Sequence, residues 1–180
     1  MPRILGLSGS LRAASFNAGL LRAAMELAPE DCPVLPGSIR EVPLYNADDE
    51  AAGGLPVAVK TLQAQLAEAD GLLLVTPEYN NGIPGVFKNA IDWMSRGDGL
   101  KIFRDKPVAI IGASPGGFGT ILSQAHWLPV MRALGAQPWF GAKLMVPQAR
   151  QAFDAEGNLT DETVRTRLQA LLASFAASLG

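Results

Sequence analysis

Short apolar runs alternate along the chain with longer segments in which hydrophobic residues recur every three or four positions. This alternation is typical of βαβ units built around a parallel sheet. The runs that we predict to be strands are Arg3 to Ser8, Pro33 to Leu35, Gly71 to Thr76, Pro107 to Gly112 and Pro138 to Val146. We therefore expect an α/β fold with a doubly wound, five-stranded parallel sheet and helices on both of its faces.

The character of each run indicates its place in the sheet. The third and fourth runs contain LLLV and VAII, and unbroken apolar sequence is typical of central strands covered on both faces. The second run lies between Pro33 and Pro36, so we predict an edge strand there. Apolar residues form helical stripes from Leu55 to Ala69 and from Val164 to Leu179. Because no linker interrupts this pattern, residues 1–180 are expected to form a single domain.

Charge and composition exclude several classes of protein. The chain has 15 Lys and Arg against 17 Asp and Glu, and a net charge of -2 provides no field that would attract nucleic acid or an anionic membrane. Cys32 and His126 are the only residues of their kinds, which excludes an internal disulfide and a zinc centre built from soft ligands. The apolar runs fall far below the roughly 20 residues of a membrane span, and the N-terminus lacks a secretory h-region. We expect a cytoplasmic protein without a metal.

Ligands of doubly wound sheets bind beyond the carboxyl ends of the strands, so the loops that follow strands one, three and four are the candidate site. The first loop, SGSLRAASFN from Ser8 to Asn17, leads directly into a helical segment. Such a loop presents backbone N–H groups to a phosphate, and Arg12 adds a full positive charge. The loop is neither a Walker loop nor a Gly-x-Gly-x-x-Gly turn. An ordinary N-capping loop with a solvated Arg12 is the alternative at this point.

The second loop, TPEYNNGIPGVFKNAIDW from Thr76 to Trp93, is rigid and polar. Gly82 and Gly85 are expected to allow positive φ values or a close approach of the backbone to a ligand. Tyr79 contributes a ring, and Asn80 contributes both a donor and an acceptor. These features favour contact with the edge of a flat heterocycle.

The third loop, GASPGGFGT from Gly112 to Thr120, is rich in glycine, which leaves its backbone N–H groups uncovered by side chains. Three such loops at one sheet edge describe the site of a mononucleotide with an extended ring system. Glu78 and Asp92 suggest an acid–base pair, but Asp92 lies deep in a helical segment. We therefore expect Asp92 to face solvent or a neighbouring chain.

The segments GSLRAASFN, TPEYNNGIPGVFKNAIDW and ASPGGFGT also resemble the NAD(P)H-dependent FMN reductase family of flavodoxin-like proteins, which includes bacterial quinone, chromate and azo-dye reductases. The resemblance extends from about Ile4 to about Val146. It implies a flavodoxin-like sheet of strand order 2-1-3-4-5. It also implies non-covalent FMN, NADPH or NADH as co-substrate, and homodimers that can pair into tetramers.

The resemblance also implies which residues bind FMN. In the first loop the implied phosphate ligands are Ser10, Arg12, Ser15 and Asn17. The implied contacts with the ring and the ribityl chain, made largely through the backbone, are Pro77, Glu78, Tyr79, Asn80, Gly82, Ser114, Gly116 and Gly117. The helix from Gly85 to Met94 would lie in the dimer interface.

A bound flavin would carry the hydride at its N5 atom, so no catalytic side chain is required. We expect ping-pong transfer of two electrons from NAD(P)H to a quinone or to another electron-poor acceptor, such as chromate, an azo or nitro compound, or free flavin. Backbone N–H groups near Gly116 and Gly117, together with the N-terminus of the following helix, are expected to stabilise the negative charge of the reduced ring.

Two questions stay open from the sequence. The basic segment from Arg96 to Lys106 is interpreted either as a solvated turn or as a loop that attracts a pyridine-nucleotide phosphate to the flavin of a neighbouring subunit. The alternatives to an enzyme are a flavodoxin-type electron carrier and a non-catalytic mononucleotide-binding regulator, because one fold serves many functions.

Overall fold

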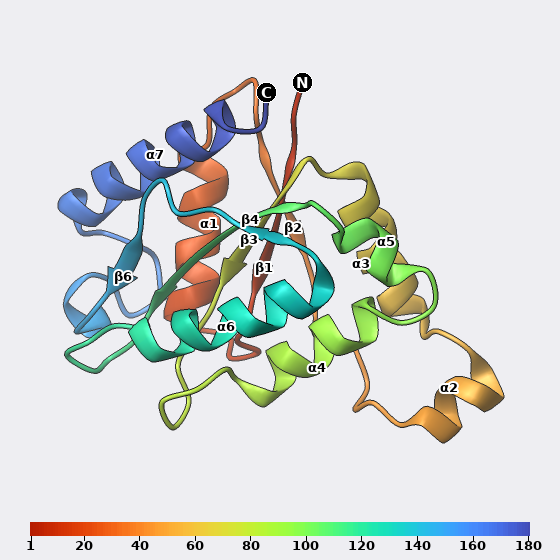
Figure 1. Cartoon of the computed structure of the whole chain (residues 1–180). Coiled ribbons are helices and arrows are strands. Elements are labelled where there is room, and N and C mark those ends of the chain that lie inside the picture. The colour runs from red at the N-terminus through yellow and green to blue at the C-terminus, as the bar shows by residue number, and fades with distance from the viewer.

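The computed structural model describes residues 1–180 and has a parallel sheet at its centre (Figure 1). Its strands are β1 (Ile4–Ser8), β2 (Val34–Gly37), β3 (Gly71–Val75), β4 (Pro107–Ala113), β5 (Gln137–Pro138) and β6 (Leu144–Val146). The strand order is β2-β1-β3-β4-β5, and β6 also pairs with β4. All pairs are parallel. The predicted α/β fold and its strand order are therefore confirmed.

Helices cover both faces of the sheet, as the sequence pattern predicts (Figure 1). They are α1 (Phe16–Leu27), α2 (Ala47–Gly53), α3 (Val57–Glu68), α4 (Gly85–Met94), α5 (Gly99–Phe103), α6 (Ile121–Leu134) and α7 (Glu162–Ala177), with a 3₁₀ turn η1 (Ala149–Gln151). Helices α1 and α7 bury their apolar residues in one core, and α3, α4 and α6 contribute to the core on the opposite face. None of these helices combines the length and the apolar character that crossing a membrane requires.

The central strands divide their side chains between these two cores. In β3, Leu73 and Val75 belong to the core with α1 and α7, whereas Leu72 and Leu74 belong to the other core. All residues of β3 are buried, which explains why its sequence is apolar at consecutive positions. Strand β2 pairs with β1 alone, so the edge position predicted from its prolines is correct.

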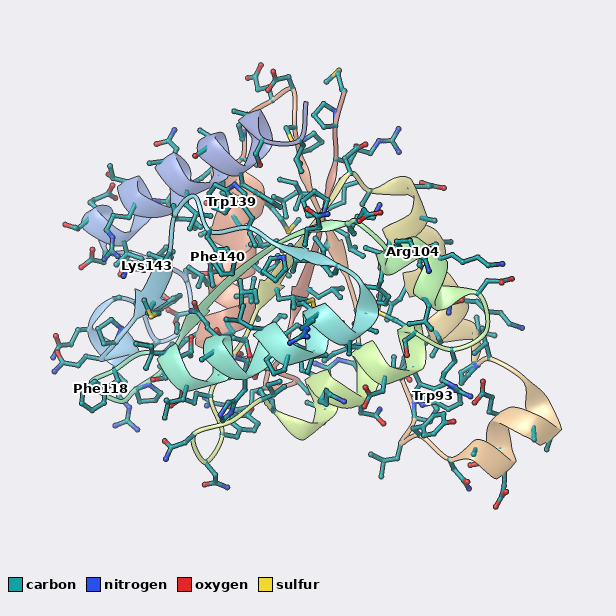
Figure 2. The ribbon with its side chains drawn as sticks, in the orientation of Figure 1. Trp93, Arg104, Phe118, Trp139, Phe140 and Lys143 are labelled. Atoms are coloured by element: carbon teal, nitrogen blue, oxygen red, sulfur yellow. The ribbon has the colours of Figure 1, made fainter.

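The fifth predicted strand is interrupted, so the expectation of one strand from Pro138 to Val146 is wrong. Strands β5 and β6 pair with opposite ends of β4, and the chain leaves the sheet between them at residues 140–143, after the Trp139 N–H has donated to the carbonyl oxygen of Val108 at 2.8 Å. The Trp139 ring packs against Phe175 of α7, with a centroid separation of 5.2 Å. A side-chain carbon on Gly141 would lie only 2.4 Å from the Trp139 ring, so the chain must bend around it. The arch leaves Phe140 pointing outward (Figure 2).

The basic segment from Arg96 to Lys106 contains α5 and packs on α3 at the amino end of β4. This position lies at the end of the sheet opposite to the carboxyl ends of the strands. Arg96 forms an ion pair with Glu50 of α2, with an N–O distance of 2.9 Å. Helix α2 itself buries no residue and projects from the body of the molecule (Figure 1). Within one chain, this basic segment therefore lies away from the candidate site.

Candidate functional site

The loops that follow β1, β3 and β4 meet at one edge of the sheet and line a common cavity of about 60 Å³. Its lining residues are Ser10, Arg12, Ser15, Phe16, Asn17, Pro77, Glu78, Tyr79, Ala113, Ser114 and Pro115. The structure thus brings together the predicted residues of all three loops. Asn80, Gly82, Gly116 and Gly117 do not line this cavity and lie farther along the same loops.

The first loop offers unsatisfied donors to an anion. The backbone N–H groups of residues 11–14 donate to no acceptor in the chain. The exposed Arg12 guanidinium reaches only the carbonyl oxygen of Ala14, at 3.5 Å. Arg40 donates to the carbonyl oxygen of Leu11 at 2.9 Å and so fixes the loop from outside. Free N–H groups beside an unpaired guanidinium are the donor set that binds phosphate, so these residues fit a nucleotide phosphate.

Ser15 and Asn17 shape this loop as well as line it. The Ser15 hydroxyl oxygen caps α1 by accepting hydrogen bonds from the backbone N–H groups of Asn17 and Ala18, at 3.2 and 3.3 Å. The buried Asn17 amide donates to the carbonyl oxygen of Ala113 at 2.8 Å and accepts from the Ala113 N–H at 2.9 Å. These bonds tie the start of α1 to the end of β4. Only the Ser15 hydroxyl hydrogen and the second amide hydrogen of Asn17 remain for a ligand.

The second loop ends in a tight turn. The backbones of Tyr79 and Gly82 exchange two hydrogen bonds, at 3.0 and 3.1 Å. Asn80 and Asn81 between them have φ values of 49° and 63°, so the turn resembles type I′. Of the two alternatives expected at Gly82 and Gly85, positive φ does not occur, because asparagine adopts the left-handed region at little cost and takes that role here. Close approach of their backbone to a ligand stays a prediction. The N–H groups of Asn80 and Asn81 donate to no acceptor in the chain.

Glu78 joins the second loop to helix α6. One of its carboxylate oxygens accepts hydrogen bonds from the backbone N–H groups of Leu122 and Ser123, at 2.9 and 3.0 Å. These groups belong to the first turn of α6, whose N-cap residue Thr120 provides no side-chain cap. The expectation that this helix N-terminus is free to stabilise a ligand charge is therefore wrong. The Glu78 carboxylate already occupies it.

We expect Glu78→Ala to lower the free energy of unfolding by about 1 kcal/mol, because two first-turn N–H groups of α6 lose their acceptor. Glu78→Gln keeps a carbonyl oxygen and should lose less. Urea unfolding of the three proteins measures the difference. Equal stability of wild type and the alanine variant would show that the cap contributes nothing.

The third loop is closed by its own serine. The Ser114 hydroxyl donates to the carbonyl oxygen of Gly119 at 2.5 Å, and Gly119 has a φ value of 65°. A side-chain carbon added at Gly116 would lie 3.6 Å from its nearest neighbour, the Ser114 hydroxyl oxygen. One added at Gly117 would have no atom within 4 Å. The N–H groups of both glycines donate to no acceptor in the chain. This part of the loop is open to a planar ligand.

The outer wall of the site is a segment that no sequence motif marks. The backbone N–H groups of Gln148 and Ala149 donate to the carbonyl oxygens of Gly116 and Ser114, at 2.9 and 3.0 Å. Arg150 follows in η1. A second cavity, of about 300 Å³, adjoins the phosphate loop and is lined by Arg12, Ala14, Phe16, Arg150, Phe153, Asp154 and Ala155. The sequence did not predict this wall, because its position depends on the short strand β6.

The remaining candidates lie outside both cavities. Asp92 forms an ion pair with Lys88 one turn away on α4, at 2.6 Å, so it is not paired with Glu78. Burial raises the pKa of the Cys32 thiol, as expected for an inert side chain. His126 is exposed on α6 near the second loop, and its Nδ1 atom would lie 3.8 Å from a side-chain carbon on Gly82.

Comparison with known proteins agrees with this geometry. Residues 2–151 match the sequence model of the family described as NADPH-dependent FMN reductase. The chain is 42% identical to an NAD(P)H-dependent FMN reductase of Pseudomonas aeruginosa over 173 residues, which cover 96% of this chain and 92% of the relative. It is 39% identical to a 2-hydroxy-1,4-benzoquinone reductase of a Burkholderia species, with coverage of 97% and 94%. The structure of FerB, a flavoenzyme NAD(P)H:(acceptor) oxidoreductase from Paracoccus denitrificans, superposes with a TM-score of 0.86 at 32% identity, covering 99% of this chain and 97% of FerB.

Proposed function

The chain belongs to the NADPH-dependent FMN reductase family, and from that premise we propose that it passes two electrons from NAD(P)H to a quinone by a ping-pong mechanism. It is an oxidoreductase with FMN as cofactor and NAD(P)H as co-substrate. The observation that carries the proposal is the set of free backbone N–H groups at residues 11–14. They lie at the carboxyl edge of the sheet, together with the Arg12 guanidinium.

Each loop has a task in this proposal. FMN, when bound, supplies the hydride chemistry at its N5 atom. The N–H groups of residues 11–14, the Ser15 hydroxyl and the Arg12 guanidinium hold its phosphate. The turn from Tyr79 to Gly82 positions the edge of the ring through its backbone. The free N–H groups of Gly116 and Gly117 stabilise negative charge on the pyrimidine side without a side-chain base.

A quinone is favoured as the acceptor by the relatives and by the surroundings of the site. The second relative is named for its action on a hydroxylated benzoquinone. Exposed rings of Tyr79 and Phe118, at 47% and 83% relative exposure, lie on the second and third loops and suit a flat apolar acceptor. Figure 2 shows Phe118 on the third loop. Chromate, azo and nitro compounds and free flavin are further acceptors that we propose for the same site.

We further propose that the protein works in the cytoplasm as a homodimer that can pair into tetramers, with α4 in the dimer interface. Val86 on α4 is exposed, as are Tyr79 and Leu122 on neighbouring segments, so a second subunit would cover apolar surface close to the site. A single buried cysteine suits a reducing compartment. Sedimentation equilibrium measures the mass of the assembly in solution. A monomeric mass would contradict the proposed dimer.

The reaction is tested with purified protein saturated with FMN. Initial rates of NADPH or NADH oxidation, measured at several concentrations of 1,4-benzoquinone, should give parallel double-reciprocal lines, because the two substrates would use the same ring in turn. Intersecting lines would contradict the ping-pong mechanism. Binding of FMN without NAD(P)H oxidation would instead favour the flavodoxin-type carrier, and failure to bind FMN would favour the non-catalytic regulator.

A further inference from the structure

Arg150 and residues of the phosphate loop line the same, larger cavity. Arg12 and Arg150 line this cavity of about 300 Å³ together, on segments that lie far apart in the sequence. Neither guanidinium takes part in any of the ion pairs of the structure. The Arg150 side chain makes no hydrogen bond at all, and the only one made by Arg12 goes to Ala14 in its own loop. Two unpaired cations therefore share one cavity.

The one carboxylate among the lining residues of this cavity is hydrogen-bonded elsewhere. Asp154 lines the same cavity, but its Oδ1 accepts from the Asn158 N–H at 2.7 Å and its Oδ2 from the Asn158 side-chain amide at 3.1 Å. The backbone N–H of Asn158 is also the main reason that the pKa of Asp154 lies below its usual value. Asp154 thus closes its own turn and forms no ion pair with Arg12 or Arg150.

The position of Arg150 is fixed by the backbone around it. Its neighbour Ala149 donates to the carbonyl oxygen of Ser114 in the third loop, so η1 is attached to the floor of the site. Phe16 and Phe153 also line the cavity, with ring centroids 5.2 Å apart. The backbone that carries Arg150 is therefore held in place, which limits the backbone entropy lost when a ligand binds.

We propose that Arg150 acts with Arg12 as a second cation for a phosphomonoester bound in this shared cavity. A phosphomonoester carries about -1.5 to -2 charges at neutral pH, whereas the phosphate loop supplies only Arg12. A second guanidinium in the same cavity matches that charge and adds directed donors. The inference rests on the proposed function, which supplies two such groups: the phosphate of FMN and the 2′-phosphate of NADPH.

The test compares wild type with Arg150→Gln, using Arg167→Gln as the matched control. Arg167 is an exposed arginine on α7 that also lacks an ion pair and lies outside both cavities. In the first arm, apo-protein is titrated with FMN and with riboflavin, which lacks the phosphate, and binding is followed by flavin fluorescence. In the second arm, the KM values for NADPH and NADH are measured at saturating FMN.

If Arg150 binds the phosphate of FMN, Arg150→Gln should weaken the binding of FMN about 10- to 100-fold, which is the effect of one lost charge-assisted hydrogen bond. The binding of riboflavin should stay unchanged. If it binds the 2′-phosphate of NADPH, the KM for NADPH should rise by a similar factor while that for NADH stays constant. The proposal is overturned if Arg150→Gln behaves like Arg167→Gln in both arms, or if FMN and riboflavin weaken equally. Wild-type protein that binds no FMN would instead refute the proposed function.

Discussion

Replacing Asn17 with alanine is expected to lower the free energy of unfolding by about 2–5 kcal/mol, because it leaves two buried backbone groups without partners. The Asn17 side chain is both donor and acceptor for the backbone of Ala113, at 2.8 and 2.9 Å. The residue is 3% exposed, so both hydrogen bonds lie in a buried environment. The variant should also bind FMN less tightly, since the phosphate loop and the third loop lose the contact that joins them.

Asn89→Ala is the matched control for this prediction. Asn89 also makes two hydrogen bonds to backbone groups, to the N–H of Tyr45 and the carbonyl oxygen of Pro43, but at exposed atoms. Water can satisfy those groups in the variant, so we expect a loss of about 1 kcal/mol or less. Urea unfolding of apo-protein measures both variants. Losses of equal size would mean that burial of the Asn17 contact is not what stabilises the fold.

Gly112→Val is expected to destabilise the protein by about 3 kcal/mol or more, since the new side chain would overlap the backbone. A side-chain carbon at Gly112 would lie 2.1 Å from the carbonyl oxygen of Thr76 and 2.3 Å from the hydroxyl oxygen of Thr120. Thr76 cannot move aside easily, because its buried hydroxyl is hydrogen-bonded with Ser123 and Trp127, at 2.9 and 3.1 Å. The clash must therefore push β4 away from the second loop.

Gly53→Ala serves as the control for the glycine substitution. Gly53 lies in α2, where a side-chain carbon would meet no atom within 4 Å, and its φ is not positive. Alanine there should be neutral or slightly stabilising. Thermal unfolding and the yield of folded protein report both substitutions. A melting temperature for Gly112→Val equal to that of wild type would show that the sheet edge yields more readily than its contacts indicate.

The central strands and the general place of the site were predictable from the sequence. The apolar runs in β3 and β4 are long enough to specify buried strands, and loops after parallel strands must meet at one edge. The interruption between β5 and β6 was not predictable, because the chain leaves the sheet after Trp139, whose ring packs against Phe175. That contact depends on α7, which lies much later in the chain.

Side-chain roles within the loops were harder to predict than the loops themselves. Asn17 and Glu78 have the chemistry of ligand-binding residues, but the structure uses them to tie α1 to β4 and to cap α6. The same atoms can serve either purpose, and sequence spacing does not distinguish a ligand from a backbone partner. Arg150 was missed for the opposite reason, since an exposed arginine outside any motif carries no signal until its cavity is known.

The arch between β5 and β6 has a consequence for how molecules of this protein meet one another. A regular strand at this side of the sheet would present a row of unpaired N–H and C=O groups, which is a template for a strand from another chain. Here the outermost strands are short pieces, Gln137–Pro138 and Leu144–Val146, separated by a segment that stands away from the sheet. This edge therefore offers little continuous main chain for pairing with another strand, and it presents instead the side chain of Phe140, which is 76% exposed.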